Sequence, residues 1–170
     1  EGHAASINWE NARVQEKLDG SLAVLYSYNG EWHIATSGTP DASGEVQGFG
    51  FTFAELFWKT FNQYNIDLSQ LDKSVTYFFE LMTQYNRIVV RHPEPKLAIL
   101  GGRNMNSQME LDHLELVNHI PSIPTVREFP LTSFDEIIKS YATIDPLNQE
   151  GYVVLDGNFN RVKMKAPQYV

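Results

Sequence analysis

The sequence predicts an α+β fold, in which antiparallel sheets are flanked by a few helices. Segments rich in apolar and β-branched residues recur along the chain, and several are joined by short turns that contain glycine, as in hairpins. Only two segments combine a helix-capping signal with apolar residues at helical spacing. The 170 residues are enough for one domain with a sizeable core, so we expect a single domain over residues 1–170.

The first hairpin is expected between residues 14 and 36. Residues 14–28 are mostly apolar and β-branched, with one interruption at Asp19-Gly20. Asn29-Gly30 is typical of the tight turn that joins two antiparallel strands, so residues 32–36 are expected to form the return strand.

Two helices are predicted from their caps. Thr52 with Glu55 forms one capping box, which begins a helix that runs to about residue 64, and Ser133 with Glu136 forms another. The residues expected on the buried faces are Phe53, Leu56, Phe57, Thr60 and Phe61 in the first helix, and Ile137, Ile138 and Tyr141 in the second.

The remaining strands are read from apolar runs. They are expected over residues 74–82, 87–90, 96–100, 151–155 and 161–165, the last two as a closing hairpin. Gly101-Gly102-Arg103 follows one of these strands, and it indicates either a β-bulge or turn, or a place where Arg103 contacts an RNA phosphate.

Composition excludes several classes of protein. The chain has no cysteine, which excludes disulfides, thiol nucleophiles and cysteine-type zinc sites. No apolar run approaches the roughly 20 residues that a membrane helix needs, so we expect no membrane partner. The absence of cysteine fits a reducing compartment, so we expect an intracellular, cytoplasmic location. The formal net charge of −8 means that any nucleic-acid contacts must be local, since proteins that hold nucleic acid by neutralising phosphates are usually basic.

Charged residues stand beside the predicted strands at four places. They are Lys17, Glu80, Glu150 and the pair Lys163 and Lys165. Taken one at a time, each has an ordinary structural explanation: a solvated turn lysine, an outward-facing glutamate on a one-sided sheet, or lysines that protect a sheet edge. Their joint order along the chain is what favours a functional interpretation.

The four places belong to four motifs: Lys17-Leu18-Asp19-Gly20-Ser21, Phe79-Glu80-Leu81, Glu150-Gly151-Tyr152-Val153-Val154 and Lys163-Met164-Lys165. This series resembles the covalent nucleotidyltransferase superfamily, which contains ATP-dependent DNA ligases, RNA ligases and mRNA capping enzymes. The runs "FELMTQYNRIVV" and "LAILGGRN" are most similar to the bacteriophage T4 RNA ligase 1 type. The resemblance implies the adenylation domain fold of that superfamily.

The resemblance also implies residue roles. Lys17 would form a covalent bond to AMP, and Lys163 and Lys165 would hold the α-phosphate. The other residues implied at the nucleotide are Glu16 near the adenine, Asp19 and Gly20 in the turn after the lysine, Glu80 at the ribose and Val153 beside the purine. Glu150 would bind Mg²⁺ or Mn²⁺, and ATP would be the nucleotide.

The chemistry of these residue types agrees with those roles. An amine must be neutral to attack phosphorus, and cations placed close to it favour the neutral form. Lys163 and Lys165 are two residues apart on a predicted strand, so their side chains should point the same way and Met164 the other way. Carboxylates such as Glu80 and Glu150 can reach a divalent ion or a ribose hydroxyl.

The implied function is an ATP-dependent RNA ligase that acts on RNA with a 5′-phosphate and a 3′-hydroxyl. The alternatives are a capping-type guanylyltransferase, the adenylation domain of a DNA ligase, or a non-catalytic module that binds RNA ends. Residues 36–41 lack the basic residue that the family often has there, and only His3 and Arg13 lie upstream of Lys17 as candidates for the β- and γ-phosphates. We therefore expect the chain to be the catalytic core of a longer protein. The sequence does not indicate the oligomeric state.

Overall fold

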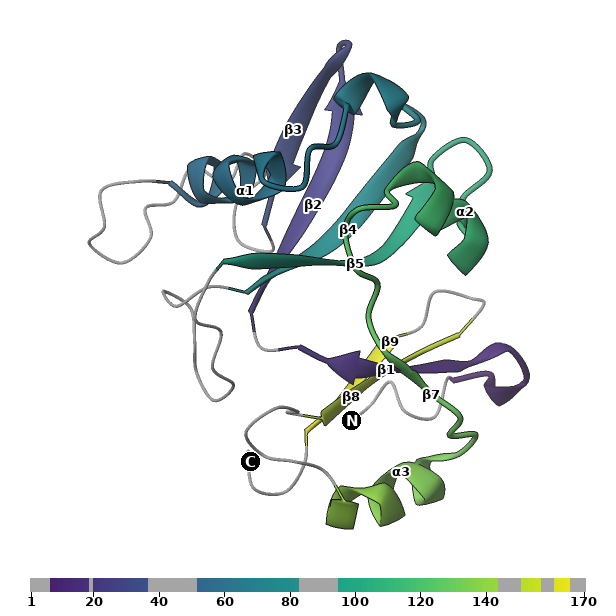
Figure 1. The fold of residues 1–170 in the computed structure, drawn as a ribbon. Helices are drawn as coiled ribbons and strands as arrows, with labels where there is room; N and C mark the ends of the chain where they lie inside the picture. Colours follow the sequence, from purple (N-terminus) through teal and green to yellow (C-terminus); the bar gives the residue numbers. More distant parts are fainter. Residues whose placement is uncertain are drawn as a thin grey trace. The chain divides into compact units, whose positions relative to one another are not determined.

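The computed structural model describes residues 7–18, 20–36, 52–82, 95–143, 151–156 and 161–165 (Figure 1). The chain forms two compact units, each with its own antiparallel sheet. The first unit contains residues 1–19, 88–91 and 126–170, and the second unit contains residues 20–87 and 92–125. The predicted α+β fold class with antiparallel sheets is confirmed.

The first unit has a four-stranded sheet in the order β7-β1-β8-β9. Its strands are β1 (Arg13–Lys17), β7 (Glu128–Phe129), β8 (Gly151–Leu155) and β9 (Arg161–Lys165). Its helical segments are the 3₁₀ turns η2 (Trp9–Asn11) and η4 (Tyr141–Thr143) and the helix α3 (Phe134–Ser140). The predicted closing hairpin is confirmed, because β8 pairs antiparallel with β9 at the predicted residues.

One face of this sheet forms the core of the first unit. The buried side chains on it are Val14, Tyr152, Val154 and Val162, with Ile137 from α3 packed against them. Ile137 is fully buried, but Ile138 is 56% exposed. The expectation that Ile138 shares the buried face is therefore wrong, because successive helical residues point about 100° apart and this seven-residue helix buries only a narrow stripe.

The ends of the first unit's elements are fixed by side-chain hydrogen bonds. The hydroxyl of Ser133 accepts the backbone N–H of Glu136 at 3.2 Å, which confirms the predicted cap of α3. The Glu136 carboxylate in turn accepts the Thr132 hydroxyl at 2.9 Å. The backbone N–H of Asn8 donates to the buried Asp156 carboxylate at 2.8 Å, which connects the start of η2 to the end of β8.

The second unit has a five-stranded sheet in the order β3-β2-β4-β5-β6. Its strands are β2 (Ser21–Tyr28), β3 (Glu31–Ala35), β4 (Val75–Met82), β5 (Lys96–Asn104) and β6 (Met109–Glu110). Its helical segments are α1 (Phe53–Asn62), the 3₁₀ turn η3 (Leu68–Gln70) and α2 (His113–His119). No helix in the described part of the chain is long and apolar enough to cross a membrane.

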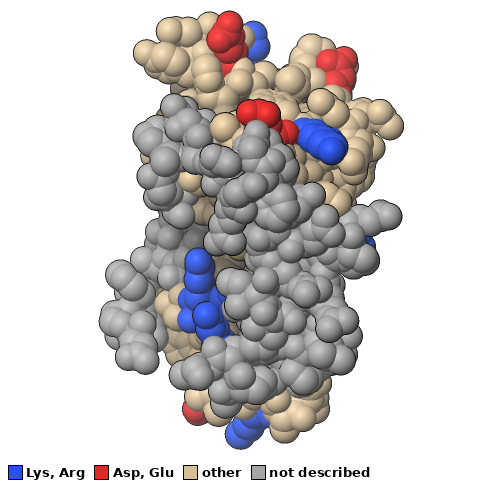
Figure 2. Space-filling model, turned by 90° about the vertical axis from the view of Figure 1, so that its left-hand side faces the viewer, with Lys and Arg blue, Asp and Glu red and all other residues tan. Residues whose placement is uncertain are grey.

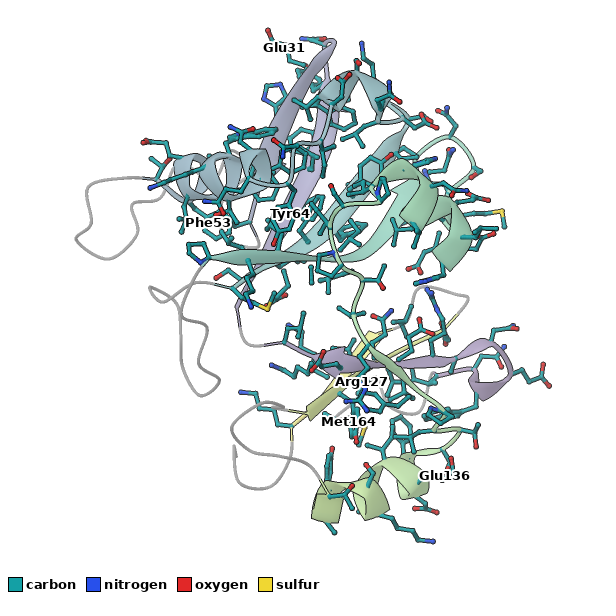
Figure 3. All side chains as sticks on the ribbon, in the orientation of Figure 1. Glu31, Phe53, Tyr64, Arg127, Glu136 and Met164 are labelled. Carbon is teal, nitrogen blue, oxygen red and sulfur yellow. The ribbon has the colours of Figure 1, made fainter. Side chains whose placement is uncertain are left out.

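The core of the second unit lies on one face of this sheet. Alternate residues of β4 are buried there, and α1 and α2 contribute further apolar side chains. The largest fully buried side chains of this core are Leu25, Phe57, Phe61, Tyr77, Phe79, Leu81, Leu97, Ile99 and Ile120. Tyr64, just after α1, accepts the backbone N–H of Leu97 at 3.0 Å, so the end of this helix is connected to β5 (Figure 3).

The turn and the cap predicted in this unit are confirmed. Asn29 and Gly30 both have positive φ, at 51° and 79°, as the tight turn of the β2–β3 hairpin requires. The Thr52 hydroxyl accepts the backbone N–H of Glu55 at 3.1 Å, and α1 follows at once.

The second unit differs from expectation at β5, at α2 and at the short strand β6, which was not predicted. β5 does not end at residue 100 but continues through the glycines, with a bulge: Phe78 pairs with Gly101 and Phe79 with Ile99, so Leu100 is the extra residue. The helix α2 was not predicted, although Asp112 caps it by accepting the backbone N–H of Glu115 at 2.8 Å. The strand predicted over residues 87–90 lies outside the described residues.

Candidate functional site

Lysines from two of the motifs lie in one row across the first unit's sheet. Lys17 at the end of β1 pairs with Gly151, and Gly151 pairs with Lys165 on β9. Residues that face each other in antiparallel strands have their side chains on the same side of the sheet. Lys17 and Lys165 therefore flank a strand position that has no side chain, and we call the side of the sheet that carries them the lysine face.

The next row of the lysine face adds the third lysine. Gln15 pairs with Val153, and Val153 pairs with Lys163. Lys163 and Lys165 are exposed, whereas Met164 between them packs on the core of the first unit, as the spacing predicted. Figure 2 shows lysine and arginine side chains gathered in one exposed group on this unit, and Met164 is labelled in Figure 3.

Gly151 is required by close packing. A Cβ atom at this position would overlap the backbone carbonyl oxygen of Met164 and would stand 2.9 Å from the Cα of Lys165. Any side chain would therefore push β9 away from β8, and with it the two lysines that β9 carries. The glycine in the motif Glu150-Gly151-Tyr152-Val153-Val154 is therefore needed for the close approach of β9, the strand that carries Lys163 and Lys165.

Two further side chains of the lysine face, Gln15 and Arg13, contact the carboxylate of Glu128 on β7. Gln15 is buried and donates its side-chain amide to Glu128 at 3.4 Å, and Arg13 stands 3.5 Å from the same carboxylate. Val153 is half-buried beside Gln15. Sequence reasoning missed Gln15 and Glu128, although the alternation Arg13, Gln15, Lys17 could have indicated that Gln15 shares the face of the lysine.

Glu16 lies on the other side of β1 from Lys17, because neighbouring strand residues alternate. It is half-buried, and its backbone N–H donates to the carbonyl of Arg127 at 2.8 Å. Burial raises the pKa of the Glu16 carboxyl, and the Arg127 guanidinium opposes that shift. Arg127 itself lies over the ring of Phe129, at 4.8 Å from the ring centre (Figure 3).

The second unit brings two other motif residues together. A Cβ atom at Gly20 would overlap the carbonyl oxygen of Leu81 and would stand 3.2 Å from a carboxylate oxygen of Glu80. The bare backbone of Gly20 thus packs against β4 beside Glu80, in agreement with the pairing of Leu22 with Glu80. Glu80 is half-buried on the side of the sheet opposite the core.

Two predicted site residues lie outside the described part of the chain: Asp19 and Glu150. Among the described residues, no group of three histidine, aspartate or glutamate side chains could hold a metal ion. Mg²⁺ needs no such group, since it commonly takes one or two protein carboxylates together with phosphate oxygens and water. A single carboxylate at residue 150, next in the chain to Gly151, is compatible with that pattern.

Comparisons with known proteins were made for sequence and for structure. No model of a known protein family matches the sequence. The chain is 33% identical over 170 residues to a protein of Autographa californica nuclear polyhedrosis virus named as a bifunctional polynucleotide kinase/RNA ligase, which covers 95% of this chain and 24% of that protein. It is 35% identical over 105 residues to an RNA ligase of Rhodothermus phage RM378. This match covers 56% of this chain and 24% of that protein. The chain spans about a quarter of the length of these curated relatives.

Solved structures share the fold. An archaeal ATP-dependent RNA ligase matches 94% of this chain and 43% of its own chain, with a TM-score of 0.67 and 18% identity. A Naegleria gruberi RNA ligase variant solved with ATP and Mn matches 94% of this chain and 50% of its own chain, with a TM-score of 0.65 and 13% identity. In sequence the chain is thus similar to viral and phage proteins named as RNA ligases, and it shares its fold with solved ATP-dependent RNA ligases, in agreement with the resemblance of its four motifs.

Proposed function

We propose that the chain is the adenylation core of an ATP-dependent RNA ligase and that Lys17 is its nucleophile. The sequence similarity to viral and phage RNA ligases supports the reaction class. The observation that carries the residue roles is the register of the first unit's sheet, which sets Lys17, Lys163 and Lys165 on one face around a glycine. An α-phosphate placed over Gly151 would be met by the Lys17 amine and by the ammonium groups of Lys163 and Lys165.

The first step would be attack of the neutral Lys17 amine on the α-phosphorus of ATP. The new P–N bond forms as the bond to the bridging oxygen breaks, pyrophosphate leaves, and the amine gives up a proton. Lys163 and Lys165 would stabilise the charge that develops on the α-phosphate oxygens, which is where fixed cations contribute most to catalysis.

Two further transfers would complete ligation. An oxygen of an RNA 5′-phosphate attacks the same phosphorus, so the P–N bond breaks and AMP passes to the RNA end. A 3′-hydroxyl then attacks the 5′-phosphate, a phosphodiester forms, and AMP leaves with the electron pair of the broken bond. RNA with a 5′-phosphate and a 3′-hydroxyl is therefore the proposed substrate.

Glu150 is the proposed ligand for Mg²⁺ or Mn²⁺, with ATP phosphate oxygens as the other ligands. A bound divalent ion would neutralise phosphate charge. Asp19 is proposed to shape the turn after Lys17, Glu80 to contact the ribose, and Glu16 and Val153 to lie near the adenine. Because the side chain of Glu16 leaves β1 on the side opposite Lys17, its backbone is better placed than its carboxylate to share the lysine's surroundings.

We further propose that the two units work as one adenylyltransferase domain over residues 1–170, within a longer intracellular protein. Lys17 ends the first unit's strand β1, and Gly20, beside Glu80, begins the second unit. The two units are adjacent in the chain at this point.

Intact mass after incubation with ATP and Mg²⁺ tests this proposal. The wild-type chain should gain one AMP, and Lys17→Ala should gain none, whereas Lys139→Ala, which changes an exposed lysine of α3, should gain AMP like the wild type. A chain supplied with RNA already adenylated at its 5′ end should seal it without ATP. An adduct that forms with GTP alone would instead indicate a guanylyltransferase, and an adduct on Lys17→Ala would refute the assigned nucleophile.

A further inference from the structure

We propose that the outer side of the β2–β3 hairpin binds unpaired RNA bases by stacking on three rings, those of Tyr26, Tyr28 and His33, which we call the hairpin platform. The identity of the ligand rests on the proposed RNA ligase function. The site itself lies outside the four motifs, and it would hold the RNA strand rather than the nucleotide.

The three rings form one continuous aromatic surface. Tyr26 and Tyr28 are two residues apart on β2 and so point to the same side, and His33 on β3 is the cross-strand partner of Tyr26. The rings of Tyr26 and His33 are stacked, with 5.6 Å between their centres and 28° between their planes. The ring of Tyr28 is 6.3 Å from the ring of His33 at 60°.

The hairpin platform lies on the side of the sheet opposite the core. The neighbouring residues that point to the other side, Leu25 and Ile34, are buried in the core of the second unit, at 0% and 3% exposure. Tyr28 is 64% exposed. An exposed aromatic ring on a strand is a surface on which any base can stack, since every base has a π-face.

The hairpin holds these rings in fixed positions before any ligand binds. Five residue pairs join β2 to β3, and the Asn29-Gly30 turn matches the twist of the strands. Tyrosine loses little conformational entropy on binding because it has only two side-chain torsions. A preformed stacking surface therefore costs less to occupy than one assembled from loops.

Charge favours bases rather than phosphates as the contacted groups. Glu31, at the tip of the hairpin in Figure 3, is the cross-strand partner of Tyr28, and the chain as a whole has a net charge of −8. A phosphate held at the tip would be repelled. Stacking does not need phosphate neutralisation, and unpaired bases expose the faces that a duplex hides.

The platform is continuous with the part of the second unit that faces the nucleotide in our proposal. Leu22 lies on the same side of β2 as Tyr26, and its partner on β4 is Glu80, the proposed ribose contact. Tyr26 is four residues after Leu22 on the strand, which is about 13 Å, the length of a few nucleotides at most. An RNA strand whose end is at the nucleotide could thus lay its next bases along β2.

Binding of a short, labelled, single-stranded oligoribonucleotide to the full chain, followed by fluorescence anisotropy, tests the platform. Tyr28→Ala and His33→Ala should each weaken binding about 5- to 150-fold, because a stacked base is worth ~1–3 kcal/mol. Tyr28→Phe should bind within about twofold of the wild type, since the ring is kept. The matched control is Met109→Ala on β6, which removes an equally exposed side chain from the same sheet and should leave binding unchanged.

Three outcomes would overturn the platform: equal affinity of Tyr28→Ala and the wild type, an equal loss in Met109→Ala, or equally tight binding of a fully paired RNA duplex. Near-identical denaturation midpoints of the variants show that loss of binding is not loss of folding. The proposed function fails separately, if the wild-type chain gains no AMP from ATP. The AMP adduct and the RNA affinity are measured independently, so failure of one proposal does not decide the other.

Discussion

Gly151 shows how a single backbone position can control the lysine face. A side chain there would displace β9, whereas Gly101, also in a strand, has open space around the position of a Cβ. We predict that Gly151→Ala lowers the free energy of unfolding by about 1–3 kcal/mol, as overpacking does, and that Gly101→Ala changes it little. Urea denaturation of the two variants measures this. Equal effects in both would show that the close approach of β9 does not constrain residue 151.

The half-buried Glu16 carboxyl should make stability depend on pH. Burial raises its pKa above the ordinary value of 4.5, so folding favours its protonated form. The contribution of this group is fully present below pH 4.5 and is lost as the pH rises through the raised folded-state pKa. We predict that, as the pH rises through that window, the free energy of unfolding of the wild type falls relative to that of Glu16→Gln. Denaturation of both proteins at several pH values tests it, and a stability difference that grows in favour of the wild type would contradict the sign.

At the scale of the elements, α3 stabilises the first unit through very few side chains. Ile137 is fully buried, whereas Ile138 is 56% exposed. We predict that Ile137→Ala costs about 2–5 kcal/mol of unfolding free energy and that Ile138→Ala costs less than about 0.5 kcal/mol. Thermal or urea denaturation of this pair measures the asymmetry. A comparable loss in Ile138→Ala would mean that α3 presents a different face to the sheet.

Local signals explain which elements could be predicted from the sequence. The β2–β3 hairpin and α1 each carry a strong local signal, an Asn-Gly turn in one and the Thr52 cap in the other, and both form where expected. α2 carries a comparable cap at Asp112, but its two leucines are only two residues apart and do not share a face: Leu116 is buried and Leu114 is 69% exposed. The glycines after Leu100 indicated a bulge or a turn, but which of the two forms depends on the pairing with β4, which no residue near position 100 reports.

The features of the candidate site also fall into those that local sequence could predict and those that it could not. The common direction of Lys163 and Lys165 follows from strand alternation and was predictable. The alignment of Lys17 with Lys165 was not, because it depends on the pairing of β1 with β8 and of β8 with β9, and β1 is more than 130 residues from β8 in the sequence. Register between distant strands is set by the packing of their buried faces, which no local pattern reports.

At the scale of the whole molecule, the acidic chain presents a local group of lysines. We predict that Lys163→Ala and Lys165→Ala fold normally but form the AMP adduct about 100-fold or more slowly, since fixed charges at a transferring phosphoryl group contribute several kcal/mol. Lys139→Ala is the control for the loss of one positive charge from the chain. Rapid mixing with ATP followed by mass measurement gives the rates. Unchanged rates in both variants would remove these lysines from the reaction.

Met164 couples the packing of the first unit's hydrophobic core to the direction in which the lysines of β9 point. It lies between Lys163 and Lys165 on β9 and packs inward while they point outward. If β9 slipped by one residue, both ammonium groups would enter the core and the thioether would take their place on the lysine face. Such a form would bury two charges and would be less stable than the observed register. The packing of Met164 therefore favours the one register in which both lysines of β9 are exposed.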